Sequence, residues 1–239
     1  MKRILLTLVL IVAAIAIQAK TLVVYYSYTN NVHDIVTALS KQIEADVVRI
    51  QPAEKGLNYA ANNYAIGSAL ISAIRNNPND AASYPAIDPV NVNLADYDCI
   101  IIGAPLWWSN MAAPLQSFLF KYGKDMSGKR IGLIVSSASS GISGVEGDAK
   151  RLISEGDFFS PSLWIRSSQT SNAAAMISEW LKTIDYDSMT GVEEIGTDQN
   201  IGKYTIFSVS GAMVAKDALS LQNLEKGLYI VNGKKIYKK

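Results

Sequence analysis

The chain has 239 residues, of which 49% are hydrophobic, so it can bury one sizeable core and a small additional unit. Residues 20–200 carry 13 basic and 19 acidic side chains, whereas residues 201–239 carry 7 basic and 2 acidic ones. The acidic body argues against nucleic acid as its partner, and the change of sign along the chain indicates two units.

The first 19 residues are typical of an export signal. Lys2 and Arg3 precede an apolar stretch of about a dozen residues, and small residues suited to cleavage follow up to Ala19. The alternative is a membrane anchor, but the apolar stretch is shorter than the roughly 20 residues that a span requires. We therefore expect a protein exported to the periplasm, the cell surface or the medium, with no transmembrane span after signal cleavage.

Between residues 20 and 185, short apolar runs alternate with segments of helical periodicity. The predicted strands are residues 21–27, 45–52, 97–105, 129–138 and 161–168. The predicted helices are residues 31–44, 59–75, 113–123, 143–156 and 172–185. Such alternation requires right-handed crossovers and a sheet covered on both faces, so we predict an α/β fold with a doubly wound, five-stranded parallel sheet. Cys99, the single cysteine, lies in the third strand and is expected to be a buried core side chain.

Ligands of doubly wound sheets bind beyond the carboxyl ends of the strands, where the strand order reverses. The loop after the first strand, residues 27–31, is rich in hydroxyls and amides and leads straight into a helix. Free backbone N–H groups and the positive end of the helix dipole suit a phosphate there. The alternative is ordinary N-capping, which requires only one such side chain.

Two further loops reach the same edge of the sheet. The loop after the third strand contains the adjacent residues Trp107 and Trp108, whose flat surfaces suit stacking on a conjugated ring, although both could instead pack under neighbouring loops. The loop after the fourth strand, "SSASSGISG", has small residues that let the backbone approach a ligand edge, although it could also be an ordinary flexible loop. None of the three loops contains Lys or Arg, so a ligand would meet neutral donors.

On these motifs, residues 20–185 resemble the flavodoxin family, in particular its branch with a "YYSYTGNT"-like first loop and a "GxPxWWxxMxxPxxxFL"-like second loop. The resemblance implies the strand order 2-1-3-4-5 and an FMN cofactor. It implies that the FMN phosphate is surrounded by Ser27, Tyr28, Thr29, Asn30, Asn31 and Val32. It places Pro105, Leu106, Trp107 and Trp108 along one side of the flavin ring. It places the pyrimidine edge of the ring against Ser137, Ala138, Ser139, Ser140, Gly141, Ser143 and Gly144.

The sequence departs from this family pattern in the first and third loops. Asn30 replaces a Gly, which Asn can do because it tolerates a positive φ. Val32 replaces a Thr, which removes a hydrogen bond to the phosphate worth about 1.5 to 3 kcal/mol. The third loop reads "SASSGISG" where the branch has a "THGGSG"-like pattern. No catalytic residue and no metal ligand is predicted, and His33, the only histidine, is expected to face solvent.

The end of the chain has a different pattern. Residues 186–200 are predicted to be a polar linker, and residues 201–239 a small β-rich segment with glycine-containing turns. The segments "VSGAMV" and "KGLYIVNGKK" resemble the C-terminal sorting domains of the bacterial type IX secretion pathway. The alternative is a folded β appendage that is retained at the periplasmic side.

Two functions are consistent with these patterns. The first is an exported FMN protein that acts in electron transfer or as a flavin-dependent oxidoreductase, with a redox protein or a small acceptor such as a quinone as its partner. The second is a flavodoxin-like binding or scaffold module of the cell envelope that has lost its cofactor.

Overall fold

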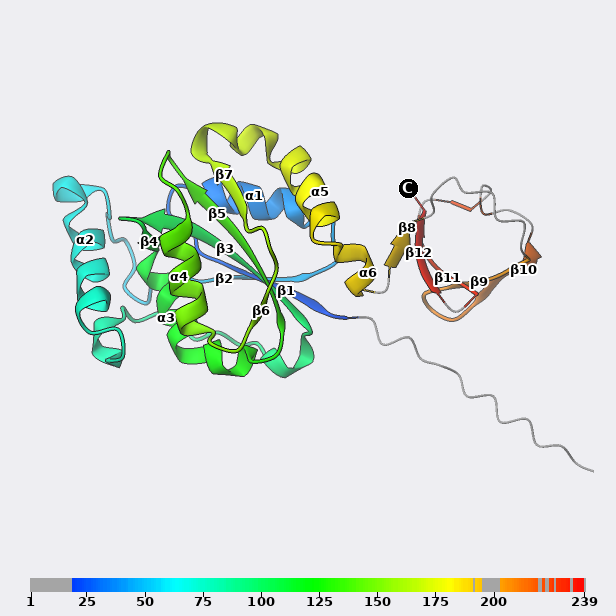
Figure 1. Cartoon of the computed structure of the whole chain (residues 1–239), viewed down its shortest axis with the longest axis horizontal. Helices are drawn as coiled ribbons and strands as arrows, with labels where there is room; N and C mark the ends of the chain where they lie inside the picture. Colours follow the sequence, from blue (N-terminus) through cyan, green and yellow to red (C-terminus); the bar gives the residue numbers. More distant parts are fainter. Residues whose placement is uncertain are drawn as a thin grey trace, which may run out of the picture. The chain divides into compact units, whose positions relative to one another are not determined.

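The computed structural model describes residues 19–190, 192–194, 203–218, 221, 224–225, 227–232 and 234–238. The predicted export signal, apart from Ala19, lies outside the described residues. The chain divides into two compact units, Ala19–Tyr186 and Asp187–Lys239 (Figure 1). No helix among the described residues is long and apolar enough to cross a membrane.

The first unit is built on a parallel sheet in the order β2-β1-β3-β5-β6, in which β7 also pairs with β5. Its parallel strands are β1 (Thr21–Tyr25), β2 (Asp46–Arg49), β3 (Cys99–Trp107), β5 (Arg130–Ser137), β6 (Asp157–Phe158) and β7 (Leu163–Arg166). β6 pairs with the start of β5 and β7 with its end, so the two occupy the place of one fifth strand. The predicted doubly wound sheet is therefore confirmed, with the strand order that the resemblance implied.

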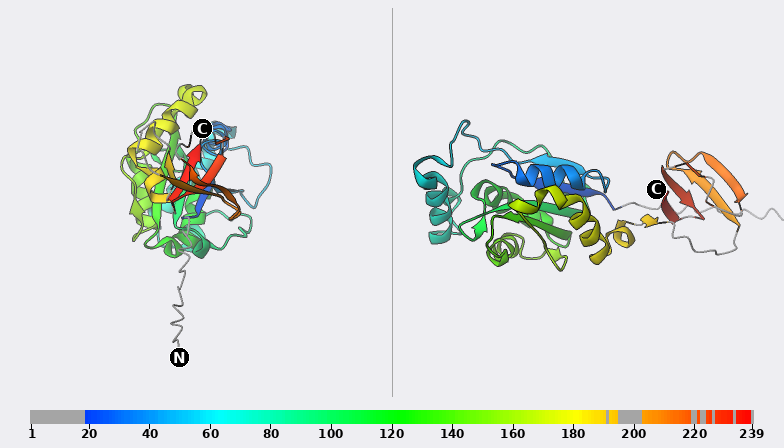
Figure 2. Two further views of the ribbon diagram at one scale, coloured as in Figure 1. Left: turned by 90° about the vertical axis from the view of Figure 1, so that its right-hand side faces the viewer. Right: turned by 90° about the horizontal axis from the view of Figure 1, so that it is seen from above.

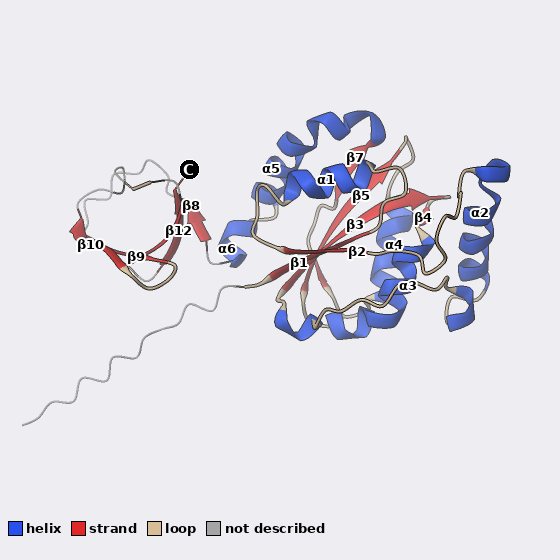
Figure 3. Ribbon diagram, turned by 180° about the vertical axis from the view of Figure 1, so that it is seen from behind, coloured by secondary structure: helices blue, strands red, loops and turns tan. Residues whose placement is uncertain are grey.

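Helices cover both faces of this sheet, as Figures 1 and 3 show. Two of them lie on one face, α1 (Asn31–Leu39) and α5 (Ala173–Thr183). The opposite face is covered by α3 (Ala113–Tyr122) and α4 (Ser143–Leu152), with α2 (Ala61–Asn76) beside α3. Short 3-10 helices lie at Ala81–Ser83, Leu94–Asp96, Gly123–Met126 and Ser167–Asn172.

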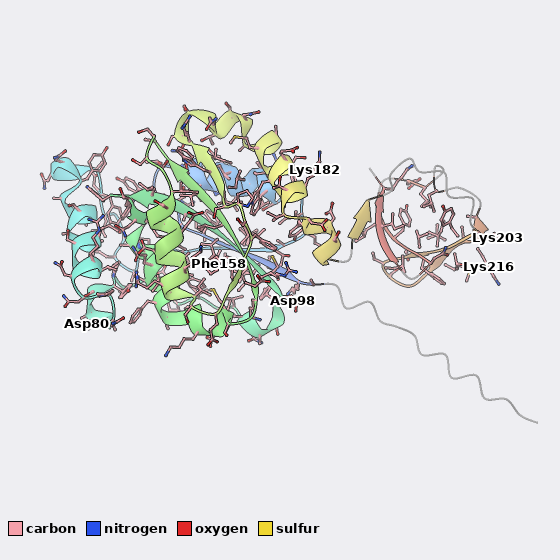
Figure 4. The ribbon with its side chains drawn as sticks, viewed as in Figure 1. Asp80, Asp98, Phe158, Lys182, Lys203 and Lys216 are labelled. Carbon is pink, nitrogen blue, oxygen red and sulfur yellow. The ribbon has the colours of Figure 1, made fainter. Side chains whose placement is uncertain are left out.

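The two helical layers bury the sheet completely at its centre. All five residues of β1 are buried, as a strand covered on both faces requires. Cys99 is 2% exposed and burial raises the pKa of its thiol to about 12, which agrees with its predicted place in the core. Phe158, labelled in Figure 4, packs from β6 against the buried cluster that contains Ile100 and Ile131.

Gly103 lets α1 lie directly on the sheet below the first loop. A Cβ atom at this position would lie 2.9 Å from Cβ of Tyr25, 3.0 Å from Cγ1 of Val32 and 3.2 Å from Cγ2 of Val36. Because Val32 and Val36 are fully buried on α1, the absence of a side chain at Gly103 sets how close the helix comes to β1 and β3.

The C-terminal unit is a five-stranded sheet in the order β10-β9-β11-β12-β8 (Figure 2, β8 yellow, the other strands orange to red). Its strands are β8 (Val192–Glu194), β9 (Tyr204–Ser208), β10 (Met213–Ala218), β11 (Gly227–Val231) and β12 (Lys234–Lys238). Ile206 and Val231 are its buried apolar side chains among the described residues, and Lys203 and Lys216, labelled in Figure 4, are exposed. The segment predicted as a linker holds α6 (Tyr186–Thr190) and β8, which pairs with β12.

A Gly103→Ala substitution is expected to destabilise the first unit by about 1 to 3 kcal/mol, because the added methyl group would push α1 away from the sheet. Urea unfolding measures the loss. Gly147→Ala is the matched control: Gly147 lies inside α4 with nothing within 4 Å of an added Cβ, so this change should be neutral or stabilise by about 0.5 to 1 kcal/mol. Equal unfolding midpoints for Gly103→Ala and the unsubstituted chain would contradict the packing described here.

Candidate cofactor site

A cavity of about 370 Å³ lies at the carboxyl ends of β1, β3 and β5. This volume falls within the range of about 300 to 1,000 Å³ that is usual for small-molecule sites. The residues that line it are Ser27, Tyr28, Thr29, Asn31, Val32, Tyr59, Tyr64, Gly67, Pro105, Leu106, Trp107, Trp108, Ser136, Ser137, Ala138 and Ser167. All of them are uncharged.

The first loop presents a row of free backbone donors. Asn30 adopts a left-handed conformation, with φ of 66°, and turns the chain into α1. The hydroxyl of Ser27 accepts a hydrogen bond from the N–H of His33 at 3.2 Å, and the N–H of Asp34 donates to the carbonyl of Asn30 at 2.9 Å. The N–H groups of residues 28–32 have no acceptor in the part of the chain that the structure describes. Together with the positive end of α1, they form a cradle suited to an anion.

Val32 contributes a hydrocarbon surface to this cradle. Its side chain is 1% exposed, and one of its methyl groups faces Gly103 in the core. The position that the family pattern gives to a hydroxyl group is therefore part of the packing between α1 and the sheet. An anion in the cradle would have to be bound by backbone N–H groups and neighbouring side chains instead.

The two tryptophans lie at a tight turn between β3 and β4 (Asn110–Met111). Leu106 pairs with Met111 and Trp107 with Asn110, so Trp108 and Ser109 alone form the turn. Both turn residues have positive φ values, 47° and 64°. This conformation suits the twist of a hairpin but costs residues other than glycine roughly 1 to 2 kcal/mol each. Contacts around the turn must offset that cost.

Two helices hold the turn from opposite sides. From α2, Nε of Arg75 donates to Oδ1 of Asn110 at 2.7 Å, and the same guanidinium donates to the carbonyl of Trp108. From α4, the buried carboxylate of Asp148 accepts hydrogen bonds from Nδ2 of Asn110 and from the N–H of Met111, each at 2.9 Å. These contacts fix the backbone that carries both tryptophans.

The tryptophan rings belong to a continuous aromatic cluster. The half-buried ring of Trp107 packs against Tyr59 at 4.9 Å and edge-on against Tyr26 at 5.7 Å between ring centroids. Trp108 is 39% exposed and meets Trp107 and Tyr64 edge-on, each at 6.4 Å. The ring of Trp107 is therefore packed mainly against other aromatic side chains. Trp108 and Tyr64 are exposed and form an aromatic rim at the cavity.

The cavity brings together residues from all three loops that the sequence singled out. These are Ser27, Tyr28, Thr29, Asn31, Val32, Pro105, Leu106, Trp107, Trp108, Ser137 and Ala138. Six other predicted site residues lie outside its lining: Asn30, Ser139, Ser140, Gly141, Ser143 and Gly144. In the third loop, Ser137 donates to the carbonyl of Ser140 at 2.8 Å and accepts a hydrogen bond from the indole of Trp164 at 2.8 Å. Gly144 lies against the tryptophan turn instead, where an added Cβ atom would be 1.8 Å from the carbonyl oxygen of Ser109.

Five lining residues were not among those predicted from the sequence: Tyr59, Tyr64, Gly67, Ser136 and Ser167. Tyr59 and Tyr64 fall within the helix predicted for residues 59–75, and no role in the site was predicted for them. Tyr59 precedes α2, and its buried hydroxyl has no hydrogen-bond partner among the described residues. Burial raises the pKa of Tyr59, so this hydroxyl stays neutral. The hydroxyl of Tyr28 ties the first loop to this segment by donating to Oδ1 of Asn58 at 3.1 Å.

His33 and Asp98 do not line the cavity. His33 is half-buried rather than solvent-facing, because Nδ1 lies 2.7 Å from the hydroxyl of Tyr25 and the two rings stack. Asp98, labelled in Figure 4, accepts a hydrogen bond from the N–H of Lys20 where the strands begin. Among the described residues, no group of acidic, histidine and cysteine side chains could hold a metal ion.

A family profile described as Flavodoxin matches residues 20–184. The chain belongs to the flavodoxin family. Its structure is similar to a candidate flavoprotein from Bacteroides eggerthii DSM 20697, with 23% identity and a TM-score of 0.56 over 70% of this chain and 98% of that one. A candidate flavoprotein from Bacteroides uniformis ATCC 8492 has 24% identity and a TM-score of 0.53, over 69% of this chain and 99% of that one. A flavoprotein in complex with FMN from Lactobacillus acidophilus NCFM has 19% identity and a TM-score of 0.52, over 65% of this chain and 99% of that one.

In this flavodoxin, Asp148→Asn is expected to destabilise the fold by about 1 to 3 kcal/mol, because one of the two carboxylate acceptors is replaced by an NH₂ group in a buried network. Urea unfolding followed by tryptophan fluorescence measures this loss. Glu146→Gln, which removes a charge from the first turn of the same helix, should lose no more than about 0.3 to 1 kcal/mol, the usual effect of an acidic side chain near a helix N-terminus. If both variants behaved alike, Asp148 would not be what holds the tryptophan turn.

Proposed function

We propose that the chain binds FMN in this cavity and acts, after export, in electron transfer or as a flavin-dependent oxidoreductase. One observation carries the proposal: the free N–H groups of the first loop and the ring of Trp108 meet in a single uncharged cavity. Membership of the flavodoxin family and the similarity to a flavoprotein in complex with FMN support the choice of ligand.

The residues present fit the parts of FMN. The N–H groups of residues 28–32 suit its phosphate, since donors at a helix N-terminus bind anions. The aromatic rim formed by Trp108 and Tyr64 suits a flat conjugated ring. The buried hydroxyl of Tyr59 lacks a partner, which a polar group of the ligand would supply.

A bound flavin supplies the one- and two-electron chemistry, and the protein supplies binding, orientation and electrostatics. The backbone of the first loop holds the phosphate, and the Trp108 turn, fixed by Arg75 and Asp148, keeps one aromatic wall in place. Burial raises the pKa values of Tyr26 and Tyr59, so the hydroxyls nearest Trp107 remain neutral. An uncharged lining disfavours additional negative charge on the ring and lowers the potential for a second electron.

Export and the redox partner form the second part of the proposal. They rest on the signal pattern of residues 1–19 and on the resemblance of residues 201–239 to type IX sorting domains. Cytosolic nicotinamides are absent outside the inner membrane, so the electron donor or acceptor would be a redox protein or a small molecule such as a quinone. A retained periplasmic form, in which the C-terminal unit is an appendage, follows from the same signal without the sorting step.

Val32 favours a second candidate function, an envelope binding module without a cofactor. Its buried methyl group replaces a hydroxyl that would donate to the phosphate, and such a hydrogen bond to a charged group is worth about 1.5 to 3 kcal/mol. The affinity for FMN would then be roughly ten- to a hundredfold lower than with a hydroxyl at this position.

Titration of the full chain with FMN, followed by flavin fluorescence, distinguishes the two functions. We expect binding with quenched flavin emission, because a stacked indole quenches a flavin. Trp108→Ala should relieve the quenching and weaken binding about tenfold, whereas Trp108→Phe, which keeps an aromatic wall, should bind with an affinity close to the original. No binding at tens of micromolar FMN would overturn the proposal and favour the module without a cofactor.

A further inference from the structure

Arg49 lies beside the first loop and does not line the cavity. It is the last residue of β2 and pairs with Tyr25 of β1. One NH₂ group of its guanidinium donates a hydrogen bond to the carbonyl of Ser27 at 2.9 Å. The centre of the guanidinium lies 5.9 Å from the centroid of the Tyr25 ring, so the side chain follows the surface of β1 to the start of the loop.

The carbonyl that Arg49 binds belongs to the same peptide group as the N–H of Tyr28. A trans peptide group is planar and directs its C=O and N–H to opposite sides. A guanidinium that holds the Ser27 carbonyl on one side therefore turns the Tyr28 N–H to the other side, where residues 28–32 form the cradle. The hydrogen bond also polarises this peptide group, which makes its N–H a stronger donor.

The charge of Arg49 is not compensated within the described residues. Its Nε is buried and has no hydrogen-bond partner. Arg49 takes no part in the ion pairs that join Lys20 with Asp46, Lys55 with Asp88, Arg130 with Asp157, and Arg151 with Asp148. A partly buried cation without an anionic partner is unfavourable, and an anion bound nearby would offset the cost. The uncharged lining of the cavity provides no such anion.

We propose that Arg49 is a positioning residue that makes this cavity select a phosphorylated flavin over an unphosphorylated one. The inference rests on the proposed FMN site. Arg49 acts through the peptide group between Ser27 and Tyr28 and through its charge beside the loop, without lining the cavity. This contribution from β2 compensates for the hydroxyl that Val32 lacks.

The test compares FMN with riboflavin, which lacks the phosphate, in titrations of the full chain. Arg49→Gln should weaken FMN binding by about tenfold or more and change riboflavin binding less than about twofold, since the lost interaction acts on the phosphate. Arg49→Lys keeps the charge but loses the planar fork, and should give an intermediate loss. Lys182→Gln is the control for net charge: Lys182, labelled in Figure 4, is exposed on α5 and should leave both affinities unchanged.

The outcomes separate this inference from the function on which it rests. If the unsubstituted chain bound neither flavin, the proposed function would fail. If it bound FMN and Arg49→Gln bound FMN equally well, only the role of Arg49 would fail. Should Arg49→Gln not fold, the salt dependence of the unsubstituted chain decides: the ratio of FMN to riboflavin affinity should fall as NaCl is raised, and a constant ratio would overturn the inference.

Discussion

The parallel pairing of β1, β3 and β5 is the constraint on which the rest of the site depends. Tyr25 lies beside Gly103, and Gly103 lies beside Ile134, so the three strands end at the same edge of the sheet. Their loops therefore meet although up to about a hundred residues separate them along the chain. Gly103 has a second role, because its missing side chain lets α1 begin directly above this edge and aim its N-terminal donors at the cavity.

The site combines two parts: a cradle of backbone N–H groups, and an aromatic turn whose backbone is stabilised by side chains from two helices. The cradle follows from the start of α1 and one left-handed residue, Asn30. The turn at Trp108 and Ser109 has an unfavourable backbone for these residue types and is held by Arg75 from α2 and Asp148 from α4. Polar side chains of α2 and α4 therefore fix the turn that carries one aromatic wall of the cavity.

The periodicity of the sequence predicted the sheet and the helices, because these follow from local spacing. The general rule for doubly wound folds indicated the edge of the sheet at which the cavity lies. Neither identified Arg49, Tyr59 or Asp148 as partners of the loops. Their contacts join residues that are far apart in the sequence, and no local pattern indicates them. The third loop shows the same limit: its composition suggested close approach to a ligand, but of its predicted residues only Ser137 and Ala138 line the cavity. The hydrogen bonds of Ser137 to Trp164 on β7 and to Ser140 are not indicated by any local pattern.

The most direct test of the FMN site is a titration of the ¹⁵N-labelled chain with FMN, followed through its backbone amide and indole resonances. If FMN binds as proposed, the amide signals of residues 28–32 move most, because their N–H groups gain a charged acceptor. The indole signals of Trp107 and Trp108 then shift with the same saturation. The same experiment with riboflavin should move the indole signals and leave the amides of residues 28–32 nearly in place. FMN-induced shifts confined to other parts of the chain, or none at all, would contradict binding of FMN in this cavity.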